Sequence, residues 1–135
     1  MKRVVLDTNV IVSAILLGGT PGRLISLWKK KIIQPFVTKE IILEYLRVLA
    51  YPDFQLTENE IHFILYHEML PFFEEVDIKS RTAVIEKDPS DDKFLHCAKA
   101  GKASAIISGD KHLLNLKSFG SILIMSPAQF LKWIS

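Results

Sequence analysis

Four acidic positions along the chain have side chains suited to phosphodiester chemistry. Asp7 comes directly after a short apolar run, Asp110 comes three residues after another, Glu44 lies in a stretch with helical spacing, and the pair Asp91 and Asp92 opens another such stretch. Carboxylates gathered in one place repel one another unless a cation joins them. Oxygen ligands of this kind suit Mg²⁺ or Mn²⁺, which lower the pKa of a water and stabilise the attacking and leaving oxygens. The pattern indicates metal-assisted hydrolysis of a phosphodiester without a covalent intermediate.

The elements that must position these acids alternate along the chain. Short apolar runs predict five strands, at residues 3–6, 33–37, 72–76, 105–107 and 121–125. Helical spacing predicts helices at residues 10–17, 20–31, 38–49, 57–70, 88–101 and 111–116, and from residue 126 onwards. Helices alternating with uniformly apolar strands are typical of a parallel sheet that is covered on both faces. We expect a single α/β domain over residues 1–135, a three-layer α/β/α sandwich around a parallel sheet of four to five strands.

Several helix ends carry recognisable signals. Thr20 followed by Pro21 predicts an N-cap and a first-turn proline for the second helix. Thr57 and Glu60 have the spacing of a capping box, which places the start of the fourth helix. Gly101 is expected at the end of the fifth helix, because glycine commonly follows a helix C-terminus.

The predicted topology brings the acids to one edge of the sheet. Ligands of such folds bind at the carboxyl ends of the strands, and the first and fourth strands are expected neighbours there, with Asp7 beside Asp110. Each acid also has a simpler interpretation. Asp7 and Asp110 could cap the helices that follow them, and Asp92 could be a favourable charge at a helix start. Glu44 could lie on a solvated helix face with Glu40, so the coincidence of several acids at strand ends is what favours a site.

Four separated segments resemble the PIN-domain ribonucleases, and specifically the small prokaryotic branch that acts as toxins of toxin–antitoxin pairs. These segments are residues 4–10, 42–49, 88–95 and 107–114. The resemblance covers nearly the whole chain, and it selects Glu44 over Glu40 because of the apolar pattern that follows Glu44. It implies an α/β/α sandwich, divalent-metal-dependent cleavage of RNA, frequent homodimerisation and often a small neighbouring antitoxin.

Polar neighbours of the acids are assigned supporting roles. Within the double acid we favour Asp92 as the direct metal ligand, and Asp91 is either a second ligand through water or a charge at the helix end. Asn9 and Ser108 are expected to orient the acids or to hold waters, as polar groups around metal ligands do. Three basic residues next to the acids are candidate RNA contacts: Arg47, Lys93 and Lys111. Phosphate contacts of this kind would make RNA binding salt-sensitive, although exposed lysines are usually only solvated.

Two other functions remain open. An aspartyl-phosphate mechanism is one, because such a nucleophile also follows a first strand. The haloacid-dehalogenase pattern would require a second Asp where this chain has Asn9, which counts against it. The other is a catalytically silent PIN-like module that binds RNA or protein. Silent copies typically lose one or more acids, and this chain has all four.

Composition narrows the class of protein further. The 135 residues include 17 Lys and Arg against 15 Asp and Glu, a formal charge of +2, so the chain does not hold nucleic acid by bulk basicity. Without the four candidate acids the balance is 17 against 11, or +6, so RNA affinity should depend on metal.

Cys97 is the single cysteine, which excludes an internal disulfide framework. The apolar run 10–17 is shorter than the ~20 residues of a membrane span, and we expect a cytoplasmic protein.

Overall fold

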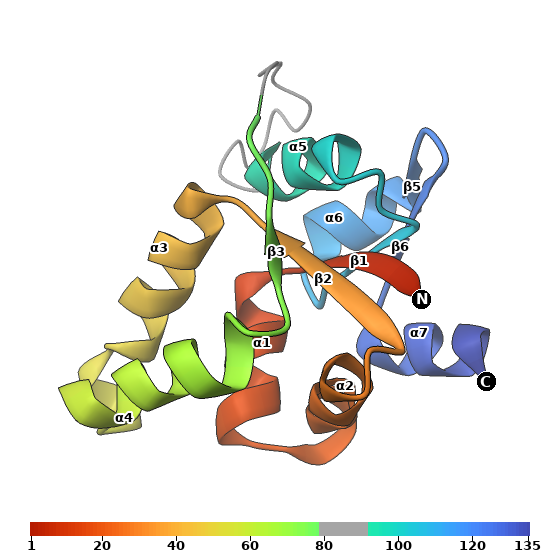
Figure 1. Cartoon of the computed structure of the whole chain (residues 1–135). Coiled ribbons are helices and arrows are strands. Elements are labelled where there is room, and N and C mark those ends of the chain that lie inside the picture. The colour runs from red at the N-terminus through yellow and green to blue at the C-terminus, as the bar shows by residue number, and fades with distance from the viewer. Residues whose placement is uncertain (79–91) are drawn as a thin grey trace.

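The computed structural model describes residues 1–78 and 92–135 and has a sheet at its centre (Figure 1). Within these ranges the sheet has six strands in the order β3-β2-β1-β4-β6-β5. The strands are β1 (Lys2–Leu6), β2 (Ile33–Val37), β3 (Glu74–Glu75), β4 (Ala105–Ile107), β5 (Ser118–Phe119) and β6 (Ile122–Met125). Every pairing is parallel except that of β5 with β6. The predicted adjacency of the first and fourth strands is confirmed.

Helices cover both faces of this sheet. The helices are α1 (Thr8–Leu16), α2 (Gly19–Lys29), α3 (Lys39–Leu49), α4 (Glu58–Phe63), α5 (Asp92–Ala100), α6 (Lys111–Leu116) and α7 (Pro127–Ile134). A short 3₁₀ turn (Pro52–Phe54) precedes α4, and a π-helical stretch (Ile64–Met69) continues it. Figure 1 shows α1, α2 and α7 below the sheet and α5 and α6 above it. The predicted three-layer α/β/α sandwich is therefore confirmed.

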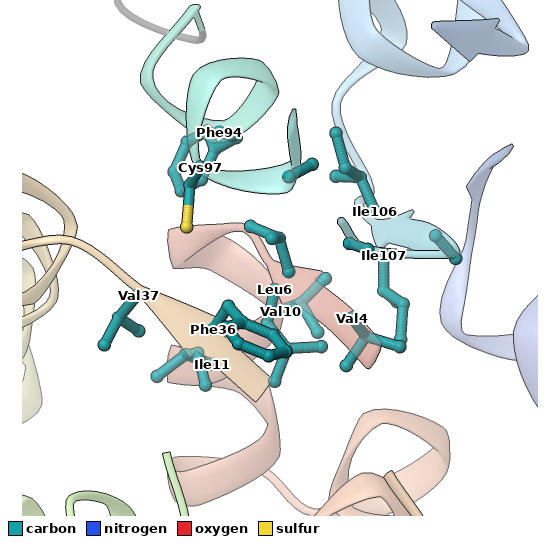
Figure 2. Close-up of a cluster of buried hydrophobic side chains, with 14 of the residues drawn as sticks. Val4, Leu6, Val10, Ile11, Phe36, Val37, Phe94, Cys97, Ile106 and Ile107 are labelled. Carbon is teal, nitrogen blue, oxygen red and sulfur yellow. The ribbon is translucent and has the colours of Figure 1, made fainter. Parts of the chain in front are cut away.

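The central strands are mostly apolar because both of their faces are covered. Val4, Val5 and Leu6 of β1 are all buried. Figure 2 shows Phe94 and Cys97 of α5 on one side of β1 and β2, with Val10 and Ile11 of α1 on the other. Burial raises the pKa of the Cys97 thiol to about 12, so the thiol stays protonated.

Two details of the strands differ from the sequence-based expectation. The third strand is reduced from residues 72–76 to Glu74–Glu75, and β5 is an additional antiparallel strand of two residues. Strands this short carry no periodicity that a sequence pattern could reveal. Pro35 is accommodated inside β2 because β3 pairs only with Phe36 and Val37, so the missing N–H of the proline breaks no pairing with β3.

The helix ends agree with prediction in most places. The capping box of Thr57 and Glu60 is present, with both reciprocal hydrogen bonds formed. The prediction that Thr20 caps the second helix is wrong. Helix α2 begins at Gly19, and its N-cap is Gly18, whose φ of +69° lets the helix start before Thr20. Residues 88–91 of the predicted fifth helix lie outside the described residues.

Gly101 follows α5, as expected, but for a different physical reason. The left-handed residue at this turn is Lys102, with a φ of 52°. A methyl group on Gly101 would lie 2.9 Å from Cγ of the buried Phe36 ring. Glycine is therefore required here by the close approach of the backbone to the core.

The described helices are short relative to the thickness of a lipid bilayer. None of them alone is long and apolar enough to cross a membrane, and α1 with α2 reach that length only as a pair bent by 93°.

Candidate active site

Asp7 stands at the junction of β1 and α1. Its Oδ1 atom accepts a hydrogen bond of 2.9 Å from the backbone N–H of Val10, so Asp7 is the N-cap of α1. Its Oδ2 atom accepts a hydrogen bond from the Ser108 hydroxyl. Only 4% of the Asp7 surface is exposed. The capping interpretation of Asp7 is confirmed, and it leaves lone pairs on both carboxylate oxygens for a further partner.

Asp110 occupies the equivalent place after β4. It caps α6 by accepting hydrogen bonds from the N–H groups of His112, at 2.7 Å, and Leu113, at 3.3 Å. Its own N–H donates to the Ser108 hydroxyl oxygen at 2.9 Å. Because β1 and β4 pair in parallel, with Leu6 opposite Ile107, Asp7 and Asp110 follow neighbouring strands at the same edge of the sheet. The predicted proximity of these two acids is confirmed.

The carboxylate of Asp7 is affected, among the described residues, by burial, by hydrogen-bond donors and by one negative charge. Burial raises the pKa of Asp7 above its ordinary value, and the negative charge of Asp110 raises it further. Hydrogen bonds from Ser108 and the backbone of Val10 and Gly109 oppose that rise. A cation between the two carboxylates would offset both the burial of Asp7 and its repulsion by Asp110.

Glu44 is held by groups from three different elements. Its Oε2 atom accepts a hydrogen bond from the Thr8 hydroxyl, and its Oε1 atom lies 2.8 Å from Nζ of Lys93 on α5. The guanidinium of Arg47 lies farther away, 3.6 Å from Oε1. Thr8 is the residue after Asp7, so this contact joins α3 to the same edge of the sheet. Glu40, one turn earlier on α3, is exposed.

The other predicted site residues lie at different depths. Asp92 is the first residue of α5 and is buried, with 7% of its surface exposed. Asp91 lies outside the described residues. Asn9 and Lys111 are exposed, so their predicted roles rest on position alone.

Tyr45 is a residue that the sequence did not identify. Its hydroxyl donates a hydrogen bond to the backbone oxygen of Leu6, directly before Asp7. The side chain is fully buried, and that burial holds the pKa of Tyr45 well above its usual value. The hydroxyl is therefore a permanent neutral donor that fixes the end of β1. The only signal for it was an aromatic residue with a polar tip next to Glu44 in an apolar helix face.

The fit of these residues to a divalent ion can be judged from the donor set. Within residues 1–78 and 92–135, no three His, Cys, Asp or Glu side chains are gathered so that they could hold a metal. Asp7 and Asp110 share Ser108 as a hydrogen-bond partner, and Glu44 contacts Lys93. The donors are nevertheless all carboxylates, and a divalent ion would offset the repulsion of the buried Asp7 by Asp110. Hard oxygen donors in this situation fit Mg²⁺ or Mn²⁺.

The comparison with protein families agrees with this arrangement. A PIN-domain model matches residues 3–112 of the chain, from the start of β1 to the residues just after Asp110. The chain belongs to the PIN-domain family. PIN domains are generally nucleases and generally use divalent metal ions, which supports a nuclease-type hydrolase and gives no support to an aspartyl-phosphate mechanism. No curated protein matches the chain.

Proposed function

We propose that this PIN domain is a divalent-metal-dependent endoribonuclease that uses Mg²⁺ or Mn²⁺. The observation that carries the proposal is the placement of Asp7 and Asp110 at the ends of adjacent parallel strands, joined through Ser108. A buried carboxylate that is repelled by a second carboxylate is costly for a structural role alone, because a neutral cap such as Asn or Ser would serve α1 as well.

The catalytic roles follow from the positions of the acids. Asp7, Asp92 and Asp110 would hold the ion, with Asp91 as a further ligand through water. When bound, a divalent ion lowers the pKa of a water and stabilises charge on the attacking and leaving oxygens of the phosphate. Glu44 completes the acidic group or orients the attacking water.

The supporting groups keep the acids in place. Ser108 holds the Asp7 carboxylate by donating to Oδ2, and it accepts the N–H of Asp110. Asn9, exposed beside Asp7 and Thr8, is proposed to hold water near the acids.

RNA would be held by basic side chains around the acids. Arg47 is 69% exposed on α3, one turn beyond Glu44, and Lys111 is exposed directly after Asp110. Lys93 is also a candidate, although its side chain is only 11% exposed. Phosphate contacts by two or three such residues predict that RNA binding weakens as salt rises.

The experiment that tests this function compares substrates and metals directly. A labelled single-stranded RNA and the DNA of the same sequence are incubated with the protein in Mg²⁺, Mn²⁺ or EDTA. We expect internal cleavage of the RNA with either metal, little cleavage of the DNA and none in EDTA. RNA binding without metal-dependent cleavage would contradict the proposal and favour a catalytically silent binding module.

We also propose that the protein acts as the toxin of a toxin–antitoxin pair in the cytoplasm. Several large apolar side chains are exposed just after α1, on α3, at the end of α4 and on the π-helical segment that follows α4. They could form a surface for self-association or for binding of a small antitoxin. They include Leu17, Leu43, Phe63 and Tyr66. Light scattering coupled to size exclusion would show a homodimer. Co-expression with the product of an adjacent small gene should give a stable complex that no longer cleaves RNA.

A further inference from the structure

Lys93 has an unusual position for a lysine. It is the second residue of α5, in the first turn, where the positive end of the helix dipole disfavours a cation. Its side chain is nevertheless 11% exposed, and its Nζ lies 2.8 Å from Oε1 of Glu44. The Phe94 ring lies beneath the ammonium group, with its centroid 5.2 Å from Nζ. A lysine held in this way is part of the interior of the site.

The charge of Glu44 is consequently balanced within the protein. One carboxylate oxygen accepts from the Thr8 hydroxyl and the other faces the Lys93 ammonium, with Arg47 nearby at 3.6 Å. The side chain of Glu44 is itself 17% exposed, so water screens this pair less than it would at the surface.

Asp7 is in the opposite situation. Among the described residues, the groups that act on its carboxylate are neutral hydrogen-bond donors and the negative charge of Asp110. Among these groups no cation offsets the repulsion of the Asp7 carboxylate by Asp110, so a divalent ion there would supply that charge. At Glu44, by contrast, the Lys93 ammonium group already contacts the carboxylate oxygen Oε1 that a divalent ion would have to bind.

We infer that Lys93 is a built-in counter-ion for Glu44, and that the site consequently holds one divalent ion, the one proposed for Asp7, Asp92 and Asp110, instead of two. This inference rests on the proposed function and specifies its metal requirement. Lys93 is a positioning residue. It keeps Glu44 beside Thr8 as a carboxylate that accepts hydrogen bonds, and it excludes a second ion by charge repulsion.

The test is a titration of the RNA-free protein with Mn²⁺. The number of ions bound per chain is measured by calorimetry and, independently, from the electron paramagnetic resonance signal of free Mn²⁺. We expect one ion per chain for the unmodified protein and two for Lys93→Met, because that change frees Glu44 for a metal. Lys99→Met is the matched control, since Lys99 is an exposed lysine near the other end of α5, and it should bind one ion. Two ions in the unmodified protein, or one in a folded Lys93→Met, would overturn the inference.

Glu44→Gln keeps the test decisive if Lys93→Met does not fold. If Glu44 is no metal ligand, this variant should still bind one Mn²⁺ ion per chain, whereas loss of the bound ion would mean that Glu44 is a ligand. The outcomes separate the two proposals. Two bound ions with RNA cleavage intact overturn this inference alone, while no bound ion and no RNA cleavage overturn the proposed function together with it.

Discussion

The Ser108 hydroxyl at the end of β4 donates a hydrogen bond to the Asp7 carboxylate at the end of β1, joining residues 101 positions apart. The same hydroxyl oxygen accepts the N–H of Asp110 at 2.9 Å. One small side chain therefore ties both strand-end acids together. This arrangement holds two negative groups close to each other before any cation is present, so the folded chain keeps a site that destabilises it.

Replacing Asp7 by Asn should remove that destabilisation. Burial raises the pKa of Asp7 in the folded protein above its ordinary value of 3.8, so the folded state favours the protonated form. The contribution of the protonated Asp7 carboxyl to folding stability is complete below pH 3.8, and it is lost as pH rises through the raised pKa. Each pH unit between the unfolded and folded pKa values corresponds to about 1.4 kcal/mol. Asn does not titrate and can still cap α1. In urea unfolding with EDTA, the free energy of unfolding of Asp7→Asn should therefore rise relative to that of the unmodified protein as pH rises from about 4 to about 8.

The control for this measurement is Asp53→Asn, since Asp53 is exposed in the 3₁₀ turn. It should unfold like the unmodified protein across the same pH range. An Asp7→Asn protein that loses stability relative to the unmodified protein as pH rises over that range would contradict the assigned direction of the change in pKa.

Tyr45→Phe should loosen the end of β1. The change removes the hydroxyl that donates to the backbone oxygen of Leu6, and losing such a buried hydrogen bond costs about 1–3 kcal/mol. Because Leu6 precedes Asp7, we expect kcat for RNA cleavage to fall more than KM changes. Tyr66→Phe is the matched control, since Tyr66 is 52% exposed, and its stability should change by less than about 0.5 kcal/mol. Equal stability of the two variants would count against a role for the Tyr45 hydroxyl.

Gly101→Ala tests the close approach between the α5–β4 turn and the core. The added methyl group would lie 2.9 Å from the Phe36 ring, and overpacking of this kind costs about 1–3 kcal/mol. Gly22→Ala is the comparison, because a methyl group there meets only the Ala14 backbone oxygen at 3.6 Å, inside α2. Thermal unfolding should show a lower Tm for Gly101→Ala and an equal or higher one for Gly22→Ala. A Gly101→Ala protein as stable as the unmodified one would mean that Phe36 can move aside.

The strand-end acids were predictable because they depend on topology. Uniformly apolar strands indicated a parallel sheet, and the connection rules of such sheets placed the first strand beside the fourth. Asp7 and Asp110 could then be brought together by their positions within three residues of the ends of those strands. The capping box of Thr57 and Glu60 was predictable for a similar reason, since its signal is local.

The contacts around Glu44 were not predictable in this way. Thr8, Lys93 and Glu44 lie on three helices, and the hydrophobic period of each helix says nothing about which polar side chains meet. Thr20 does not cap α2 because the helix begins earlier, at Gly19, with Gly18 as its N-cap. Local patterns therefore located the elements and the two strand-end acids, whereas the long-range polar pairs required coordinates.

The acids at the strand ends are central to the proposed metal-dependent cleavage of RNA. The most direct measurement is the rate of cleavage of a labelled RNA in Mn²⁺ by the unmodified protein, Asp7→Asn, Asp110→Asn and the exposed control Glu40→Gln. We predict that both Asp variants lose at least about 100-fold in rate, since even a group that only orients a metal ligand is worth about 10–100-fold, and that Glu40→Gln retains full activity. Full metal-dependent cleavage by Asp7→Asn and Asp110→Asn would contradict this role for the strand-end acids.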